Sequence, residues 1–236
     1  MANQYLSEQL GSTAIGEIAV ISGTEGRHAV TVSRLAVGEL VRVGNGVGMI
    51  ASGTVTGVAP SEFRFAVETI ETVGRPAPGI WLAQALAKGD RDELAIQAAT
   101  ELGVDGIIPW AAARSISRWE GAKVARGQER WAAVVREATK QSARAWLPEV
   151  APLVSTKQLA GLVETARMIV LDPVTDTSLT AADLDERDIV LVVGPEGGIS
   201  PAEFDLLQVA GATRARLGGS ILRTSTAGPA AIAVLS

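Results

Sequence analysis

The chain has 236 residues, of which 47% are hydrophobic and 20% are charged, values that are ordinary for a globular protein of one large or two small domains. No run of eighteen apolar residues occurs, so we expect no membrane span, and the first ten residues do not resemble a secretory signal. With no cysteine and a single histidine, His28, disulfides, thiolate metal sites and multi-histidine metal sites are excluded, and a cytoplasmic location is expected.

The charge is unevenly distributed along the chain. The net charge of −5 argues mildly against a nucleic-acid partner, because phosphate contacts need clustered lysine and arginine. Residues 114–144, however, carry eight basic and three acidic side chains, a local charge of +5, whereas residues 1–71 carry a local charge of −3. The segment 114–144, which we call the basic belt, is therefore the part of the chain best suited to phosphate contacts.

Residues 1–72 are predicted to form a small β-rich domain. The short runs 17–21, 40–43, 53–58 and 63–70 are typical of strands, and 25–35 favours one short helix. Asn45-Gly46 between apolar flanks is a strong hairpin signal. This pattern favours a compact barrel or sandwich. Residues 73–79, with two prolines and two glycines, are the best candidate for a linker.

From residue 80 to residue 236 the pattern indicates an α/β domain. Strands are predicted at 80–86, 106–110, 168–171, 189–193 and 214–217, and helices at 90–102, 122–145, 201–210 and 226–235. Nearly continuous apolar strands that alternate with helices are typical of a parallel sheet covered on both faces.

The strongest local signal is the loop after the strand at 189–193. Gly194, Gly197 and Gly198 allow backbone amides to approach a ligand closely, and Ser200, Pro201 and Glu203 predict a fully capped helix start. Ligands of open α/β sheets bind at the carboxyl ends of strands. The alternative is a tight strand-to-helix turn without a ligand. Neither a P-loop nor a dinucleotide-binding motif is present here.

A second glycine-bearing loop follows the strand at 214–217. Gly218 and Gly219 are followed by an apolar pair, Ile221 and Leu222, and then by Arg223 before a helix rich in Ser and Thr. Two such loops from nearby strands would form a pocket with apolar walls and many backbone donors and acceptors. That composition suits an adenosine moiety, and it lacks the basic cluster that a triphosphate requires.

These two loops, in this order and spacing, resemble the SPOUT superfamily of knotted methyltransferases and, more narrowly, the RsmE family. The resemblance covers nearly the whole chain. It includes the segments 87–90, 97–104, 114–115, 130–131, 136–138, 141–142 and 147–149, together with Arg144 and a helix with His28 that ends at Arg34-Leu35.

The resemblance implies a PUA-like, OB-related β-barrel for RNA in residues 1–72 and a methyltransferase domain with a trefoil knot in residues 80–236. It further implies a homodimer that binds S-adenosylmethionine (SAM) without a metal and methylates N3 of a uridine in 16S rRNA, either free or in the assembled 30S subunit. The cofactor residues that it implies are Leu171, Gly194, Glu196, Gly198, Ile199, Leu217, Gly218, Ile221, Leu222 and Arg223.

Two residues are candidates for catalysis. Uracil N3 must lose its proton, and a cation such as Arg223 would stabilise the negative charge that develops on the flanking oxygens. Glu196 would act as a base or bind the cofactor. In many relatives a Glu stands where this chain has Ser225, which puts any role for a carboxylate at that place in doubt.

The candidate RNA-binding residues lie in the N-terminal domain and the basic belt: His28, Arg34, Arg114, Arg118, Arg136, Lys140 and Arg144. The last three recur every four residues, which predicts one helical face, and a solvated face without a ligand is the commoner meaning of such a stripe. Two other functions stay open: a SPOUT enzyme with a different RNA target, and a catalytically silent RNA-binding protein.

Overall fold

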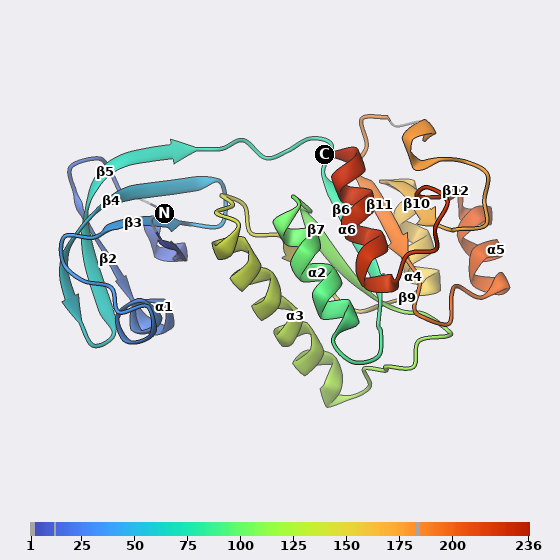
Figure 1. Ribbon diagram of the computed structural model, residues 1–236, viewed down its shortest axis with the longest axis horizontal. Coiled ribbons are helices and arrows are strands. Elements are labelled where there is room, and N and C mark those ends of the chain that lie inside the picture. The colour runs from blue at the N-terminus through green and yellow to red at the C-terminus, as the bar shows by residue number, and fades with distance from the viewer. Residues whose placement is uncertain (1–2, 12, 183–184) are drawn as a thin grey trace. The chain divides into compact units, whose positions relative to one another are not determined.

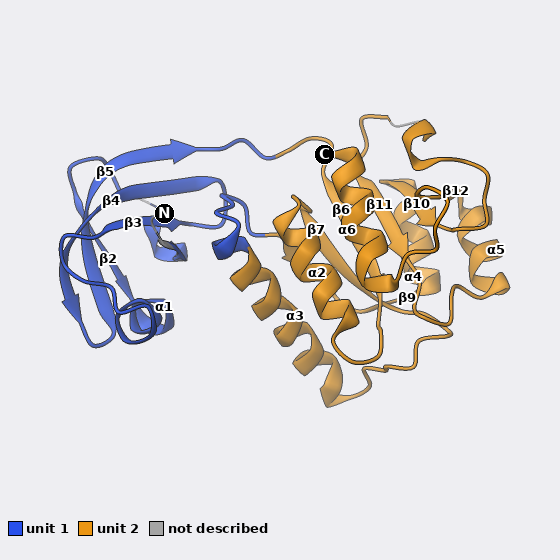
Figure 2. Cartoon of the chain, in the orientation of Figure 1, with its two compact units in different colours: residues 1–75, 139–147 blue, residues 76–138, 148–236 orange. Residues whose placement is uncertain are grey.

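The computed structural model describes residues 3–11, 13–182 and 185–236, and the chain divides into two compact units. Unit 1 consists of Met1–Arg75 and Thr139–Leu147, and unit 2 of Pro76–Ala138 and Pro148–Ser236 (Figure 2). Each unit is thus built from two separate stretches of the chain.

Unit 1 is an open, curled five-stranded sheet with a short helical segment (Figure 1). Its elements are β1 (Asn3–Leu6), β2 (Ile18–Ser22), α1 (Gly23–Arg27), a π-helical turn (His28–Val32), β3 (Leu40–Gly44), β4 (Met49–Ala59) and β5 (Glu62–Thr72). The strand order is β1-β3-β4-β5-β2, with β1 parallel to β3 and the other pairs antiparallel. The sheet ends at β1 and β2, so it is a half-barrel rather than the closed barrel or sandwich expected from the sequence.

The core of unit 1 is aromatic and β-branched. Tyr5, Phe63 and Phe65 are buried. The Phe63 ring packs in a tilted arrangement against Tyr5, with centroids 5.3 Å apart, and against Phe65, with centroids 6.2 Å apart. Burial alternates along β2 and β5, because one face of the curled sheet packs on this core and the other faces solvent.

Residues 139–147 complete unit 1 through backbone and side-chain contacts. The Gln4 side chain donates to the Arg144 carbonyl at 2.8 Å, and the Trp146 indole donates to the Val73 carbonyl at 2.9 Å. Leu147 N–H donates to the Gly46 carbonyl at 2.9 Å. Unit 1 therefore needs a segment that lies more than sixty residues beyond its last strand.

Unit 2 contains a seven-stranded, fully parallel sheet. Its elements are β6 (Ile80–Ala85), α2 (Arg91–Glu101), β7 (Gly106–Ala111), α3 (Ala122–Gln141, whose last three residues belong to unit 1), β8 (Glu149–Val150), β9 (Val154–Ser155), α4 (Thr156–Gly161), β10 (Arg167–Leu171), β11 (Ile189–Val193), α5 (Pro201–Ala210), β12 (Thr213–Ala215) and α6 (Thr224–Leu235). The strand order is β12-β10-β11-β6-β7-β8, and β9 also pairs with β7.

Helices cover both faces of this sheet. One core contains Ala83 and Val192 from the sheet with Leu159 of α4 and Leu207 of α5. On the opposite face α6 packs against α2, β6 and β11 (Figure 1). Gly228 of α6 lies so close to Leu82 that an added Cβ would be 2.8 Å from it. The predicted doubly covered parallel sheet is therefore confirmed.

Most predicted elements are present, with differences at their ends. The 45–46 hairpin is confirmed, although its connection runs from Asn45 to Gly48, where the Asn45 side chain accepts from the Val47 and Met49 amides. β1, β8, β9 and α4 are present in addition to the predicted elements. The predicted helix 122–145 was too long: α3 ends at Gln141, and Ala143 has a φ of 55°.

The early end of α3 corrects one expectation about the basic belt. Arg136 and Lys140 lie on α3, but Arg144 lies beyond it and cannot share their helical face. A search of the described residues finds no helix that is long and apolar enough to cross a membrane.

Candidate functional site

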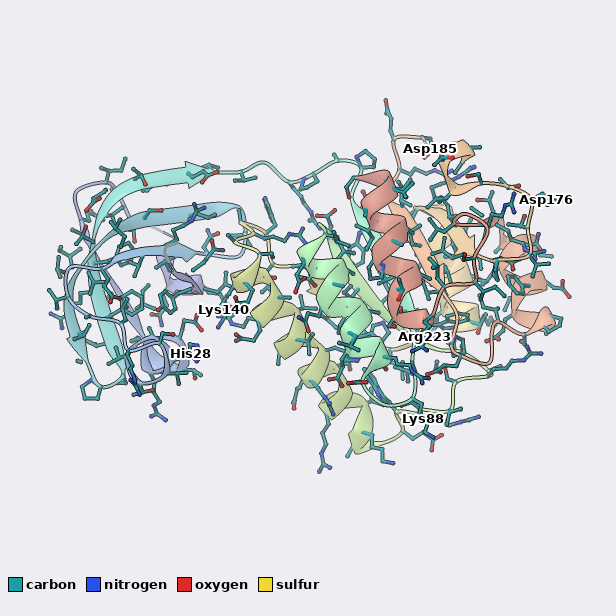
Figure 3. The ribbon with its side chains drawn as sticks, in the orientation of Figure 1. His28, Lys88, Lys140, Asp176, Asp185 and Arg223 are labelled. Atoms are coloured by element: carbon teal, nitrogen blue, oxygen red, sulfur yellow. The ribbon has the colours of Figure 1, made fainter. Side chains whose placement is uncertain are left out.

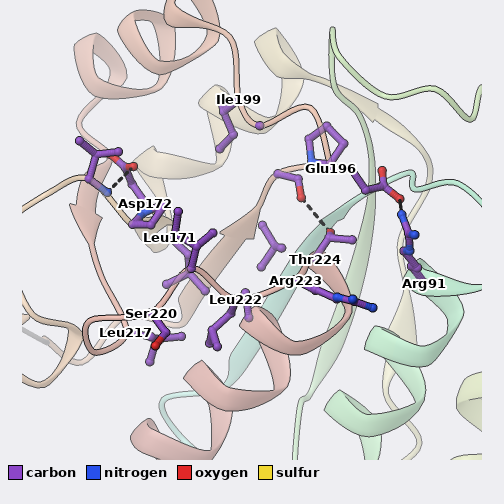
Figure 4. A pocket seen from close by; sticks show the side chains of 18 of the residues that line it. Arg91, Leu171, Asp172, Glu196, Ile199, Leu217, Ser220, Leu222, Arg223 and Thr224 are labelled. Carbon is purple, nitrogen blue, oxygen red and sulfur yellow. Dashed lines mark hydrogen bonds and ion pairs between the residues drawn. The ribbon is translucent and has the colours of Figure 1, made fainter.

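A pocket of about 600 Å³ opens at the carboxyl ends of β10, β11 and β12 (Figure 4). Its walls come from the segments that follow these three adjacent strands and from the start of α6. Carboxyl ends of parallel strands are the usual position of ligand sites in open α/β sheets. The two glycine-bearing loops identified in the sequence meet here.

Nine of the ten residues expected to bind a cofactor line this pocket; they are Leu171, Gly194, Glu196, Gly198, Ile199, Leu217, Ile221, Leu222 and Arg223. Gly218 lies in the same loop, with a φ of 59°, but it is not part of the lining. The lining is mixed, with apolar side chains beside the exposed backbone of the glycine loop.

Sequence reasoning missed several lining residues, chiefly Arg91, Asp172, Phe204 and Thr224. Arg91 directly follows the segment 87–90, and Asp172 directly follows the predicted strand residue Leu171. Their proximity to recognised motifs was a usable signal. Phe204 carried no such signal, because the sequence indicated only where its helix, α5, begins.

The first loop is held rigid by the helix that follows it. Ser200 and Glu203 form a reciprocal capping box with Pro201 at the first position of α5, which confirms the predicted helix start. The Gly198 amide donates to the Pro195 carbonyl at 2.8 Å. A Cβ on Gly194 would lie 2.7 Å from the Ile199 side chain, so only glycine fits this close approach.

Glu203 ties three segments together beneath this loop. Its carboxylate accepts from the Ala113 amide at 2.7 Å and the Thr156 hydroxyl at 2.9 Å, in addition to Ser200. Burial alone would raise the pKa of Glu203, but the hydrogen bonds from Ala113, Ser200 and Thr156 together hold the pKa below its ordinary value. The ionised side chain therefore fastens the end of β7 and the start of α4 to the glycine loop.

A second hydrogen-bonded chain joins the loop to the middle of the sheet. The buried Gln84 side chain donates to the Thr224 hydroxyl at 2.9 Å, and that hydroxyl donates to the Gly194 carbonyl at 2.8 Å. These contacts fix the start of α6 against the end of β11. The orientation of the pocket backbone thus depends on two buried side chains far apart in sequence.

Glu196 connects the loop to the start of α2. Its carboxylate accepts from Arg91 Nη1 at 2.8 Å and from the Lys88 amide at 3.2 Å. Partial burial would raise the pKa of Glu196, but hydrogen bonds from its own amide, from Arg91 and from Lys88 lower it below the ordinary value. The side chain is therefore ionised and engaged near neutral pH, an arrangement suited to positioning.

Asp172 and Phe204 form the far wall of the pocket. The Asp172 carboxylate is buried and pairs with Arg214, whose guanidinium lies over the Phe204 ring, 4.7 Å from its centroid. The ion pair gives the buried carboxylate a partner and holds the ring at the pocket edge.

Arg223 lines the pocket and its side chain is exposed, as is that of Arg91 (Figures 3 and 4). It stands at the N-cap position of α6, and its carbonyl accepts from the Thr226 and Ala227 amides. In Figure 4 its side chain extends along the side of the pocket where Arg91 and Glu196 meet. The Arg223 side chain therefore lies on the same side of the pocket as the Arg91–Glu196 ion pair.

Four of the seven candidate RNA-binding residues belong to unit 1 and three belong to unit 2. In unit 1, His28 is half-buried at the start of the π-helical turn, Arg34 is exposed with a φ of 55°, and Lys140 is buried against Glu25, Nζ to Oε1 3.4 Å (Figure 3). Arg144 is half-buried in unit 1.

The remaining three residues lie in unit 2. Arg114 is exposed and donates to the Gly197 carbonyl at 3.1 Å, beside the glycine loop. Arg118 is exposed and lines a second pocket, while Arg136 is half-buried on α3. Among the residues that the structure describes, no group of three or more His, Cys, Asp or Glu side chains could hold a metal ion.

Comparisons with known proteins agree with this arrangement. Residues 75–236 match the family model described as an RNA methyltransferase domain. Ribosomal RNA small subunit methyltransferase E of Mycobacterium tuberculosis is 41% identical over 92% of this chain and 85% of its own length. The Bacillus subtilis protein of the same name is 30% identical over 92% of this chain and 88% of its own length.

Two solved structures match over the whole chain. A putative methyltransferase from Legionella pneumophila in complex with SAM superposes with a TM-score of 0.89 at 28% identity, covering 100% of this chain and 97% of that one. Ribosomal RNA small subunit methyltransferase E from Neisseria gonorrhoeae, bound to S-adenosyl methionine, gives the same TM-score and coverage at 26% identity.

Proposed function

Because the chain belongs to the RsmE family of RNA methyltransferases, we propose that it transfers the methyl group of SAM to 16S rRNA of the small ribosomal subunit. One observation carries this proposal. The two glycine-bearing loops lie far from Arg91 in sequence, yet all three line one pocket at the ends of three parallel strands. Relatives that share this fold were solved with SAM bound.

The residues of the pocket fit SAM. Its volume of about 600 Å³ lies within the range of small-molecule sites. Leu217, Ile221 and Leu222 offer apolar surface for an adenine ring, and the Gly194–Ile199 backbone offers hydrogen-bonding groups. Gly218, which has a φ of 59° in the same loop, is also proposed as part of the cofactor site. When bound, SAM supplies an electrophilic methyl group.

The base that we propose as acceptor is a uracil, methylated at N3. Methyl transfer of this kind depends chiefly on positioning of donor and acceptor. Arg223 would stabilise the charge that develops on the uracil oxygens as N3 loses its proton. Glu196 would hold Arg91 and the Lys88 segment at the pocket mouth, and its engaged, ionised carboxylate favours this role over that of the general base.

The proposed domain organisation assigns RNA binding to a PUA-like domain in residues 1–72, a linker to 73–79 and methyl transfer to 80–236. A trefoil knot is proposed for the C-terminal part of the second domain. The support for it is the resemblance of the two glycine-bearing loops to those of the SPOUT superfamily.

The proposed state of the protein is a cytoplasmic homodimer acting on free 16S rRNA or the 30S subunit. Exposed Leu94 on α2, Leu102 at its C-cap and Val234 on α6 offer apolar surface on two helices that pack together. Light scattering after size-exclusion chromatography tests the dimer, and a mass of about 24.4 kDa would contradict it.

The deciding experiment measures transfer of a labelled methyl group from SAM to 30S subunits and to free 16S rRNA from a strain that lacks this enzyme, followed by mapping of the modified nucleotide. We expect one uridine to carry an N3 methyl group. Modification of another base or of a ribose would refute the proposed target. No transfer, together with no SAM binding by calorimetry, would refute the enzymatic function.

A further inference from the structure

A second pocket, of about 360 Å³, lies in unit 2 at the start of α3. It is lined by the loop that leads into α2, by the segment before α3 and by the first turns of α3. Four basic side chains contribute to it: Arg118, Lys123, Arg126 and Arg130. The cofactor pocket contains none of these residues, so the two pockets are distinct.

Most of this positive charge is not neutralised by the protein. Arg130 pairs with Glu93 at 2.6 Å. Arg118, Lys123 and Arg126 are exposed and make no ion pair with any residue that the structure describes. The other acid of the lining, Asp92, is buried and accepts from the Ala87 and Glu93 amides. Three exposed cations around one concavity repel each other unless an anion binds between them.

The wall that carries these cations is rigid. The Trp119 and Trp131 rings pack edge to face with centroids 5.1 Å apart, and Trp131 is buried. A Cβ on Gly127 would lie 2.4 Å from the Trp119 ring, so α3 and the preceding segment are in close contact. Arg118 precedes Trp119 directly, and Arg126 precedes Gly127. Both cations are therefore anchored next to a packed aromatic contact.

A single loop separates this pocket from the proposed methylation site. Ala87 and Gly89 line the basic pocket, whereas Arg91, two residues on, lines the cofactor pocket. The same loop is fastened to Glu196 through Lys88 and Arg91. Because the two pockets lie on either side of one short loop, an RNA strand whose base reaches Arg223 can extend its flanking phosphates toward the basic pocket.

We propose that the pocket formed by Arg118, Lys123 and Arg126 binds a backbone phosphate of the rRNA strand that flanks the methylated nucleotide. The proposal rests on the proposed function and adds a substrate subsite to it. Phosphate contacts fix the register of a nucleic acid without reading its sequence. The subsite would thus determine which nucleotide reaches the cofactor.

The test compares two lysines in equivalent helix positions. Lys123 is the second residue of α3 and Lys157 the second residue of α4; both are exposed, and only Lys123 lines the pocket. The variants K123Q, R126Q and K157Q each remove one charge. Binding to 30S subunits and to 16S rRNA is measured across a salt series at constant magnesium, with SAM affinity measured separately by calorimetry.

We expect K123Q and R126Q each to weaken RNA binding about threefold to tenfold and to reduce the salt slope by about one, with K157Q unchanged. SAM affinity should stay at the wild-type value in all three variants. Equal RNA binding by K123Q, R126Q and K157Q would overturn the proposal, as would a wild-type protein that binds neither RNA. If the wild-type protein binds RNA and these variants weaken that binding, but no methyl group is transferred, only the proposed function would be refuted.

Discussion

At the scale of single residues, the cations around the pocket differ in whether they are paired with an acid. Arg91 and Arg214 are committed to Glu196 and Asp172, and both pairs shape the walls. Arg223 extends at the pocket mouth from a backbone position fixed by the start of α6. A side chain placed in this way can change its contacts when substrate arrives without disturbing the fold.

Arg223→Ala should therefore separate cofactor binding from turnover. We expect SAM affinity to change little and kcat to fall about a hundredfold, since an exposed cation that stabilises developing charge acts mainly in the transition state. Calorimetry with SAM and single-turnover methyl transfer measure the two quantities. Arg216→Ala, in the same loop but outside the pocket lining, is the control. Unchanged turnover in R223A would remove Arg223 from the mechanism.

Thr224→Val tests the hydrogen-bonded chain from Gln84 to Gly194. The change keeps the shape of the side chain but removes the hydroxyl that accepts from Gln84 and donates to the Gly194 carbonyl, so that Gln84 Nε2 keeps only the Ala85 carbonyl as acceptor. We expect a loss of about 1–3 kcal/mol in the free energy of unfolding and weaker SAM binding. Exposed Thr226→Val in the same helix is the matched control. Denaturant unfolding measures the stability and calorimetry the SAM affinity. Equal stability and equal affinity of the two variants would contradict this role.

At the scale of elements, local sequence was informative wherever a helix start carries its own capping residues. Ser200, Pro201 and Glu203 predicted the start of α5 correctly, because a capping box needs only residues within one turn. The end of α3 was not readable in this way. The chain leaves the helix at Gln141 and then makes long-range contacts in unit 1, including that of the Arg144 carbonyl with Gln4.

The same distinction applies to the candidate site. Both glycine loops were identifiable from strand, turn and helix signals in a short window. The contributions of Arg91 and Thr224 arise instead from contacts across more than a hundred residues. Such contacts depend on strand order in the sheet, which places β6 beside β11, and strand order is not encoded in local periodicity.

Gly194→Ala should weaken SAM binding because it changes the shape of the loop. The new methyl group would lie 2.7 Å from the Ile199 side chain and 3.3 Å from its amide, so the loop must move. Gly219→Ala is the matched control, because a Cβ there meets nothing within 4 Å. Calorimetry should show at least a tenfold loss of affinity for G194A alone, equivalent to about 1.4 kcal/mol. Wild-type affinity in G194A would show that the loop tolerates displacement.

Glu203→Gln should alter the acid stability of unit 2. The folded-state pKa of Glu203 lies below its unfolded value of about 4.3, so its stabilisation is present above that pH and disappears as the pH falls through the folded pKa. We expect E203Q to be about 1–3 kcal/mol less stable near neutral pH. Its deficit should shrink in acid. Urea unfolding from pH 7 down to pH 3 measures this, and a deficit that is constant with pH would contradict it.

At the scale of the whole molecule, the two units differ in architecture although each is built from two stretches of the chain. Unit 2 buries a parallel sheet between helices, whereas unit 1 is an open half-barrel whose packing includes residues 139–147. Within that segment, Trp146 contacts the rest of unit 1 in two ways: its indole donates to the Val73 carbonyl, and its ring lies against Gly48.

Trp146→Ala should therefore loosen unit 1 and spare unit 2. We expect amides of β3, β4 and β5 to lose protection from hydrogen exchange, with a local cost of about 2–4 kcal/mol because Trp146 is only partly buried. Amides of β6, β10 and β11 in the same sample serve as the internal control. An equal loss of protection in both sheets, or in neither, would contradict an independent role of this segment.

The discontinuous make-up of unit 1 has a consequence for biosynthesis. A ribosome releases the five strands of the half-barrel long before it releases the stretch that closes their contacts, and β6, α2, β7 and most of α3 emerge in between. The amino-terminal sheet therefore lacks these contacts while the central part of the polypeptide is being synthesised. Its final packing therefore follows the synthesis of residues 139–147, even though its strands are translated first.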